Sequence, residues 1–437
     1  MMNKKKLWKW HSWLGLYSGL VICILSFTGA LAVFKFEIDH LLNKDLFYVV
    51  PQEKIGNVNQ FIYDILAHYP EHSGYIVEPA EAENRSWKVA FRVKEEGQNI
   101  AKEVFFNPYT GEVLGERDMY KTVAFFIRNI HVRLFDGWYG RQWVGLAGVC
   151  MFLSLAISIP LYFDFTKKQK FGEVRTKRSR QKWADLHKFI GLATIVFHLI
   201  IAFTGAWLGL QPKIQKPLIG ERPGIYKPAE FPLSKNEDKL VEIDFPTLLS
   251  KVKKEFPELT SLKIKASADG SRTATVYGNI PWMPYERQTN FVVLDKEDLL
   301  LIKKLDIRKT GIGSHLFYMQ EALHFGDFWG IGLKVIYCLF GLIGGFLGIS
   351  GFFVYYKRTE KKRVQRYPLL TTANIIYGFT FICLLVTALI AFSSVNFGAN
   401  YPTSTITTPS FYVILSAYII YRLMRYFFKK GFLHVEA

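Results

Sequence analysis

The chain alternates between long apolar stretches and long polar ones. Six of the apolar stretches approach or exceed the roughly 20 residues that an α-helix needs to cross the hydrocarbon core of a bilayer. They cover residues 13–34, 143–163, 187–210, 331–355, 372–394 and 409–427. This pattern predicts a multi-pass α-helical membrane protein with six spans.

Two polar segments, one after the first span and one after the third, have the periodicity of small folded domains. The first contains a predicted helix and then predicted strands, at residues 59–68, 74–77, 87–93, 104–106 and 112–116. The second repeats this order, with a helix and strands at residues 245–256, 262–266, 273–277, 290–294 and 299–305. One helix and about four antiparallel strands in each copy predict two small α+β domains.

The spans that carry histidine belong to an internal repeat. Residues 11–34 align without a gap on residues 187–210, and both segments begin with histidine. The sequence Thr-Gly-Ala that starts at Thr28 recurs in register at Thr204. A duplicated membrane helix is therefore part of the architecture.

A second pair of matching segments leads into the second and fourth spans. Each places an apolar residue before a histidine, His131 or His324, and an aromatic–glycine turn after it. The unit of span, outer domain, histidine and span thus occurs twice in the same direction, which predicts a parallel repeat about the membrane normal. Its four helices form the predicted core, and the last two spans form an added C-terminal hairpin. Glycines such as Gly15, Gly341 and Gly345 are expected to allow close helix approach.

The basic residues indicate the orientation in the membrane. The net charge of +18 arises in residues 1–9, 164–182, 357–366 and 422–437, which together hold 22 basic and 4 acidic residues. Such an excess is typical of cytoplasmic loops. We therefore expect both termini and these loops on the cytoplasmic side of the membrane. The bilayer is then the partner of the basic segments, and nucleic acid is not.

Spans and loops together divide the chain into nine segments. The predicted boundaries are 8–35 for the first span, 36–130 for the first outer domain, 131–164 for the second span with its entrance motif, 165–182 for a basic cytoplasmic loop, 183–210 for the third span, 211–320 for the second outer domain, 321–356 for the fourth span, 357–370 for a second basic loop and 371–437 for the hairpin and tail. All four cysteines lie inside spans, so no disulfide framework is expected in the outer domains.

Six of the ten histidines lie in spans or at their entrances, where an ionisable side chain is costly unless it is used. Three uses are possible: haem ligation, hydrogen-bonded packing, and proton transfer or binding of another metal. The spans hold almost no Asp or Glu as proton partners, and their cysteines lie at scattered depths. Haem needs imidazoles on facing helices with apolar and aromatic walls, and the pattern favours this use. The other two uses stay open.

The repeat places the histidines at two levels. His11 and His187 are gapless equivalents, and we expect them to hold an inner haem together. The outer haem has three candidate ligands, His131, His198 and His324, of which one is left over. Symmetry favours His131 with His324. A straight helix would put His198 on the same face as His187 and about 16 Å deeper, which supports His198 instead.

Two arginines flank His131 without a counterpart at the other entrance. Arg128 and Arg133 lie within three residues of it. Guanidinium groups bind carboxylates through paired hydrogen bonds, so both arginines are candidates for contact with haem propionates. Contact with lipid headgroups is the alternative.

These motifs resemble the PepSY-associated transmembrane-helix family, which includes inner-membrane siderophore-iron reductases. The resemblance is carried by residues 10–16, the Thr-Gly pairs, the entrances at His131 and His324, and residues 107–115, which look like the closing hairpin of a PepSY domain. It covers about residues 8–358. It implies two PepSY-like periplasmic domains and two b-type haems between four core helices.

The resemblance also implies an activity. It is electron transfer by a haem-dependent membrane oxidoreductase, from quinol or another membrane donor to a periplasmic acceptor, often ferric iron in a siderophore. The chain has no Gly-x-Gly-x-x-Gly fingerprint after a strand and no P-loop, so we expect no nicotinamide or flavin of its own. The alternative function is a membrane-anchored PepSY protein that restrains a periplasmic protease or senses a ligand, with structural histidines. The second outer domain has residues 295–298 in place of the Pro-x-Thr-Gly turn.

Overall fold

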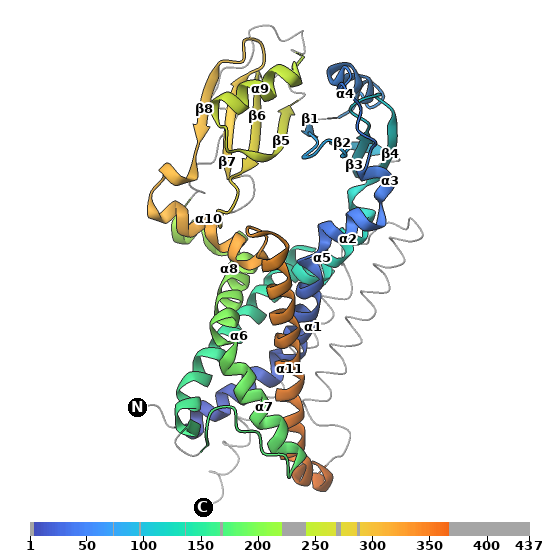
Figure 1. Ribbon diagram of the computed structural model, residues 1–437. Coiled ribbons are helices and arrows are strands. Elements are labelled where there is room, and N and C mark those ends of the chain that lie inside the picture. Colours follow the sequence, from blue (N-terminus) through green and yellow to red (C-terminus); the bar gives the residue numbers. More distant parts are fainter. Residues whose placement is uncertain are drawn as a thin grey trace, which may run out of the picture.

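The computed structural model shows a bundle of long helices joined to a single β-sheet (Figure 1). The residues that it describes are 4–72, 74–95, 98–135, 137–166, 169–220, 242–267, 272–285 and 289–366. The predicted spans at 372–394 and 409–427 lie outside these residues, so the C-terminal hairpin stays a prediction.

The bundle, in the described residues, consists of four long helices with apolar stretches and a shorter, more polar one. The long helices are α1 (Lys4–Ala32), α6 (Gly137–Thr166), α8 (Ile195–Ile219) and α11 (Gly330–Arg366), and the shorter one is α7 (Ser179–Ala193). By length and composition α6, α8 and α11 can each cross a membrane, and α1 adds a fourth span if its two bent halves count as one. Large apolar side chains such as Phe203 and Leu339 are 58% and 54% exposed on the bundle surface. A helix surface of this kind is matched to lipid rather than to water.

The helices pack in a ring that follows the repeat. Helix α1 packs against α6 and α11, α8 packs against α6, and α7 packs against α11. At two equivalent places the helices approach so closely that a residue larger than glycine would be crowded. A Cβ added to Gly341 on α11 would lie 3.1 Å from the Cβ of Ala30 on α1, and one added to Gly148 on α6 would lie 2.8 Å from the nitrogen of Ala206 on α8. The close approach predicted for Gly341 is therefore confirmed. The same prediction for Gly15 is wrong, because a Cβ there would meet nothing within 4 Å.

The first helix of each repeat is interrupted at the same position. Helix α1 bends by 55° between Leu16 and Ser18, and the second copy breaks at Thr194, between α7 and α8. Ser18 and Thr194 are equivalent in the repeat, and each donates its hydroxyl to the carbonyl four residues earlier, at 2.6 Å and 2.9 Å. This back-bonding destabilises and bends helices. The predicted continuous helix over 187–210 is therefore two helices.

Short helices connect the bundle to the outer sheet. They are α2 (Lys35–Leu42), α3 (Lys44–Phe47), α5 (Val123–Arg133) and α10 (Ile312–Phe325), with 3₁₀ turns at Met119–Lys121 and Ile307–Lys309. Helices α5 and α10 occupy equivalent places, since each follows the last strand of its unit and leads into a long helix of the bundle. They carry the two entrance histidines.

The outer units have the predicted elements. The first contains α4 (Val58–Ala67), β1 (Gly74–Glu78), β2 (Trp87–Glu95), β3 (Gln98–Phe106) and β4 (Val113–Asp118). The second contains α9 (Phe245–Glu255), β5 (Thr260–Ser267), β6 (Thr273–Asn279), β7 (Asn290–Asp295) and β8 (Leu301–Leu305). Seven strands lie within two residues of their predicted positions, whereas β3 begins six residues before the predicted 104–106.

The two units are not separate sheets. Strands β1 and β5 pair antiparallel, with Tyr75 opposite Ala266 and Val77 opposite Ile264, and the strand order is β4-β3-β2-β1-β5-β6-β7-β8. Each of these strands would otherwise be an edge with unpaired backbone groups. The prediction of two α+β units holds for their elements, but the two units share one sheet.

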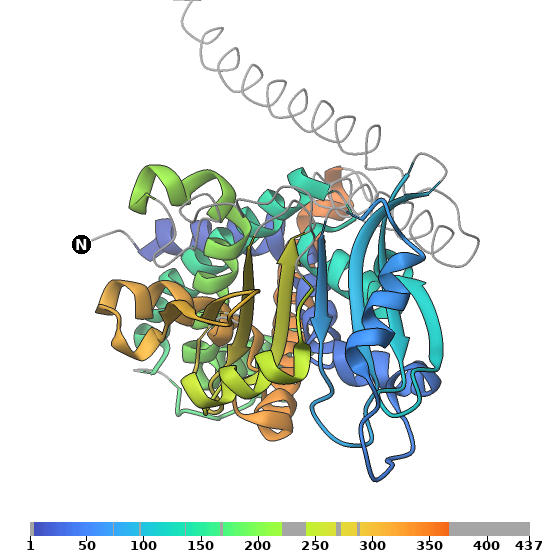
Figure 2. The ribbon, with the colours of Figure 1, turned by 90° about the horizontal axis from the view of Figure 1, so that it is seen from above.

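Helices α4 and α9 cover one face of this sheet, on the side away from the bundle (Figure 2). The core between them and the strands includes Ile62, Val77, Phe106, Leu248 and Ile264, all at most 1% exposed. Because strand side chains alternate, residues 78, 88, 103 and 263 belong to the opposite face.

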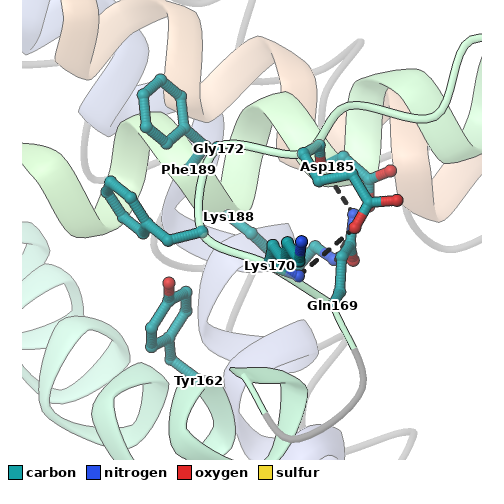
Figure 3. A pocket seen from close by; sticks show the side chains of 9 residues that line it. Tyr162, Gln169, Lys170, Gly172, Asp185, Lys188 and Phe189 are labelled. Atoms are coloured by element: carbon teal, nitrogen blue, oxygen red, sulfur yellow. Dashed lines mark hydrogen bonds and ion pairs between the residues drawn. The ribbon is translucent and has the colours of Figure 1, made fainter.

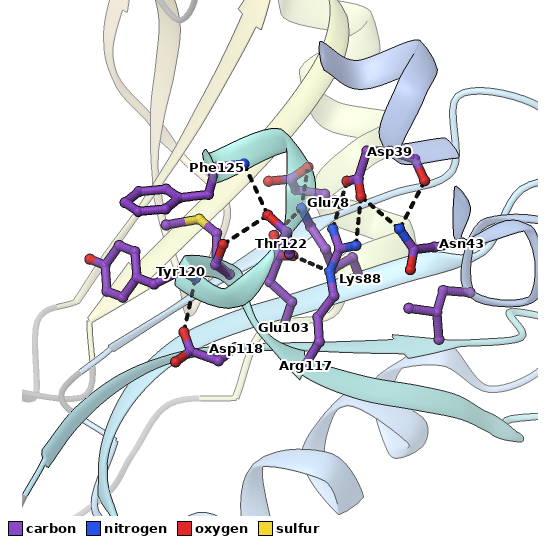
Figure 4. A network of polar contacts seen from close by, with 12 residues as sticks. Asp39, Asn43, Glu78, Lys88, Glu103, Arg117, Asp118, Tyr120, Thr122 and Phe125 are labelled. Atoms are coloured by element: carbon purple, nitrogen blue, oxygen red, sulfur yellow. Dashed lines mark hydrogen bonds and ion pairs between the residues drawn. The ribbon is translucent and has the colours of Figure 1, made fainter. Parts of the chain in front are cut away.

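A chain of charged residues crosses that opposite face (Figure 4). Arg117 contacts Asp39 with two bonds of 2.8 Å and Glu103 at 2.9 Å. Lys88 contacts Glu103 at 2.8 Å and Glu78 at 3.3 Å, and Glu78 continues to Lys263 of the second unit at 2.8 Å. Burial alone would raise the pKa of Glu78, but the two lysines outweigh it and lower the pKa. The network therefore ties α2, next to the membrane helix, to both units.

Candidate functional site

The inner histidine pair lies between α1 and α7. The ring centroids of His11 and His187 are 6.4 Å apart. Nδ1 of His11 lies 3.0 Å from both the carbonyl and the hydroxyl oxygen of Ser154 on α6. Nδ1 of His187 lies 2.9 Å from the hydroxyl of Ser350 on α11. Each ring is thus held from behind by the other long helix of its own repeat.

The outer pair lies between α5 and α10. The ring centroids of His131 and His324 are 6.1 Å apart. Nδ1 of His131 lies 2.9 Å from the carbonyl of Leu25 and 3.3 Å from the hydroxyl of Thr28. Nδ1 of His324 lies 3.0 Å from the hydroxyl of Thr204. Equivalent threonines therefore hold equivalent rings.

These contacts fix which ring nitrogen carries the proton. A carbonyl can only accept, so Nδ1 of His11 and of His131 must donate. The Thr28, Thr204 and Ser350 hydroxyls each donate their proton to a carbonyl of their own helix, at 2.7, 2.7 and 3.1 Å. These hydroxyls can then only accept from the histidines. In all four rings Nε2 is left with a free lone pair, and it makes no hydrogen bond to any described residue.

Glycines make room for three of the four rings. A Cβ added to Gly29 would lie 2.8 Å from Cε1 of His131, and one added to Gly205 would lie 3.0 Å from Cε1 of His324. A Cβ on Gly351 would lie 3.2 Å from Cε1 of His187. The Thr-Gly pairs are thus explained residue by residue, because the threonine orients a ring and the glycine gives it space.

The remaining candidate for the outer site, His198, does not join either pair. His198 on α8 is 2% exposed, and its Nδ1 and Nε2 lie 3.0 Å and 3.2 Å from the carbonyls of Thr194 and Phe340. A Cβ on Gly344 would lie 3.0 Å from its Nε2. Both ring nitrogens therefore face backbone of the bundle. Of the three outer candidates, the structure brings together His131 and His324 and leaves His198 apart.

The arginines beside the outer pair lie on α5. The Nε atom of Arg133 is buried and has no hydrogen-bond partner among the described residues. Arg133 and Glu321 both act electrostatically on the guanidinium of Arg128. Glu321 is the residue that the repeat aligns with Arg128. A buried guanidinium nitrogen without an acceptor fits the binding of an added carboxylate.

The separations of the two pairs would suit one metal ion each. Metal–nitrogen bonds of about 2 Å, added to the half-widths of two rings, would give roughly 6 Å between ring centroids. The observed separations are 6.4 Å and 6.1 Å. A proton on Nδ1 donated to a carbonyl or hydroxyl is the arrangement that metal-ligating histidines adopt. No group of three or more His, Cys, Asp or Glu side chains converges in the described part of the chain.

A folded loop braces the start of α7 (Figure 3). Asp185, which is 1% exposed, accepts from the backbone N–H, Nε and Nη2 of Arg175 at 3.0, 2.9 and 2.9 Å, and Lys188 lies 2.8 Å from it. The hollow beside these residues measures about 20 Å³, close to the size of one water molecule. The loop thus braces the helix that carries His187. The hollow itself offers no room for a larger ligand.

Sequence reasoning missed the residues behind the rings. Ser154 and Ser350 are polar residues inside apolar spans, and that signal was available. Asp185 stands two residues before His187, at the start of the segment predicted as the third span. Their partners lie 143, 163 and 10 residues away in the chain, so the contacts themselves depend on the fold.

No curated protein matches the chain. The sequence profile described as the PepSY-associated TM region matches residues 8–358, which is most of the 437 residues. The match spans both histidine pairs, the shared sheet and the four helices of the repeat. The chain is a membrane protein that belongs to the PepSY-associated transmembrane family.

Proposed function

We propose that this protein is a haem-dependent oxidoreductase of a bacterial inner membrane. One b-type haem is held by His11 and His187 and a second by His131 and His324. Electrons pass outward from quinol or another membrane donor to a periplasmic acceptor, for which ferric iron in a siderophore is the proposed class. The outer sheet is then a pair of fused PepSY-like units on the periplasmic side.

The observation that supports the proposal is the state of the four imidazoles. Each donates from Nδ1 and offers an Nε2 lone pair, and the rings face each other in two pairs. Haem iron supplies one-electron transfer at a potential set by its axial ligands and surroundings. Serine and threonine hydroxyls contact the Nδ1 atoms of all four rings.

The positions of the two pairs suit transfer across a membrane. Gly29, which receives the ring of His131, follows His11 by eighteen residues of α1. The rise is at most about 27 Å, which approaches the thickness of the hydrocarbon core. Arg128 and Arg133 mark the outer level, where they would hold propionates.

The experiment is to purify the chain and measure haem directly. We expect two haems per chain by the pyridine haemochrome method and b-type bands in the dithionite-reduced minus oxidised spectrum. A colourless preparation from haem-replete cells would reject the proposal. The acceptor is tested by mixing the reduced protein with a ferric hydroxamate and following reoxidation, with a gallium hydroxamate as the redox-inert control.

The direction of transfer is tested separately through topology. Alkaline-phosphatase fusions at residue 175 should be inactive and those at residue 90 active, because the basic loops are expected in the cytoplasm. The reverse pattern would overturn the outward direction and leave the haem count unaffected.

A second candidate function, ligand binding by the outer sheet, has one observation in its favour. A groove of about 540 Å³ is lined by both units, including Trp87 and Tyr109 from the first and Leu249, Leu259 and Leu262 from the second. This volume is typical of small-molecule sites. Saturable binding of an apolar fluorescent probe that is lost in Leu262→Arg would support it, and unsaturable or unchanged binding would not.

A further inference from the structure

The two outer units differ in the connection between their second and third strands. In the first unit β2 ends at Glu95 and β3 begins at Gln98, which leaves two residues between them. In the second unit β6 ends at Asn279 and β7 begins at Asn290, which leaves ten. Residues 281–285 of this longer connection read Pro-Trp-Met-Pro-Tyr. The repeat thus identifies an insertion that the fold of the unit does not require.

Trp282, within the insertion, is both exposed and strained. Its side chain is 71% exposed, and its backbone lies in the left-handed region with a φ of 64°. That region is unfavourable for a bulky residue unless the surroundings impose it. A large apolar ring held outward in this unfavourable conformation indicates a binding role rather than a packing one.

The insertion is fixed at its base on both sides of this ring. Ile280 is 8% exposed and Met283 packs against the core of the sheet. Tyr285 packs against the smaller cluster formed by Ile307, Phe317 and Tyr318. The loop is therefore anchored by packing on both sides of Trp282, whose ring is exposed.

The tip of the insertion is joined to the start of a membrane helix. Nε1 of Trp329 donates to the carbonyl of Trp282 at 3.2 Å. Trp329 is 56% exposed and directly precedes Gly330, the first residue of α11. Ile331, one residue further, is 59% exposed. Trp282 therefore lies beside the first residues of α11, a helix that can cross a membrane.

We propose that residues 280–285 form a membrane-docking loop whose partner is the interfacial layer of the bilayer that α11 crosses. The rings of Trp282 and Trp329 lie among the lipid headgroups, where tryptophan is enriched because it has an apolar body and one N–H. The loop holds the second unit of the sheet to the lipid surface. This inference rests on α11 as a membrane helix and is independent of haem.

The test uses a fluorescent label in lipid nanodiscs. Trp282→Cys, in a chain whose four natural cysteines are replaced by alanine, carries a nitrobenzoxadiazole label. The matched control is Lys254→Cys on α9, an exposed position on the side of the sheet away from the bundle (Figure 1). We expect phosphatidylcholine with a doxyl group high on its acyl chain to quench the label at 282 several-fold more than the label at 254. Equal quenching at the two positions would overturn the proposal.

A second variant, Trp282→Gly, controls for the case in which the loop does not fold when the tryptophan is replaced by cysteine. Trp282→Gly removes the ring but suits the left-handed backbone, so the loop and the carbonyl that Trp329 contacts should be retained. In brominated lipid, the quenched part of the native tryptophan fluorescence should be smaller in Trp282→Gly than in the unaltered chain. The same quenched fraction in both would show that Trp282 does not touch lipid.

Discussion

Gly29 offers a way to disturb the outer histidine pair without touching a ligand. In Gly29→Ala the new Cβ would lie 2.8 Å from Cε1 of His131, and ordinary contact begins at 3.4 Å. The imidazole must therefore retreat by at least 0.6 Å. Distances in a metal site are held within about 0.2 Å. We expect the ring to be displaced beyond that tolerance, so that the outer cofactor is lost or weakly held.

The same substitution should leave the helix intact. Alanine in a helix interior is more stable than glycine by about 0.5–1 kcal/mol, so loss of cofactor cannot be ascribed to a weakened α1. Gly15→Ala is the matched control, because it changes the same helix in the same way and its Cβ would meet nothing within 4 Å. Gly205→Ala should act as Gly29→Ala does, since its Cβ would lie 3.0 Å from Cε1 of His324.

The measurement is the haem-to-protein ratio with the optical spectrum of each purified variant. We expect about one haem in Gly29→Ala and two in Gly15→Ala, with similar melting temperatures. Two haems with unaltered spectra in Gly29→Ala would refute the steric argument and the assignment of His131. Loss of haem in both variants would trace the effect to α1 as a whole rather than to the ring.

The remaining predictions concern the inner histidine pair, His198 and the charged network on the outer sheet. His187→Ala should lower the haem content to about half and leave the outer haem reducible. His198→Ile, which installs the residue found at the equivalent position of the first repeat, should keep both haems; loss of one would make His198 a ligand. Glu78→Gln should destabilise the outer sheet in urea by roughly 3 kcal/mol at pH 7, near the lower bound for breaking a buried ion pair, because the Glu78 side chain is 25% exposed. The folded pKa of Glu78 is lowered below its usual 4.5, so its contribution is present above that pH and is lost on acidification. The difference between the two proteins should therefore shrink in acid, and a gap that stays constant down to pH 3 would contradict the ion-pair account.

The local elements could be predicted because their signals are local. The residues from Trp87 to Val93 alternate between apolar and polar, which predicts a strand with one apolar face. The observed strand begins at Trp87 and ends at Glu95, two residues beyond the predicted end. The pairing of His11 with His187 and of His131 with His324 was also within reach, since a gapless repeat of a parallel unit brings equivalent residues to one axis.

The rest depends on contacts that no local pattern specifies. The joining of β1 to β5 matches Val77 with Ile264, which are far apart in the sequence and have no turn to set their register. A straight helix over residues 187–210 would carry His198 on the same face as His187. The hydroxyl of Thr194 breaks that helix, and the same feature at Ser18 bends the first copy. Only the comparison of the two copies shows the break to be systematic.

Some features of the molecule occur in both copies of the repeat and others in only one, and this difference bears on its function. Several features around the facing imidazoles obey the repeat: the histidines, the Thr-Gly pairs and the helix interruptions all occur twice, although Ser154 and Ser350, which contact the inner rings, are not equivalent. Two features near the outer ends of the helices do not obey it. Arg128 aligns with Glu321, so the two sides of the outer pair have opposite charges, and the insertion with Trp282 occurs in the second unit alone. A symmetric interior suits a cofactor relay, which needs equivalent ligands from both halves. An asymmetric outer end suits the approach of a partner from one side. In the proposed arrangement Trp282 holds the second unit to lipid, while the first copy presents the positive charge of Arg128.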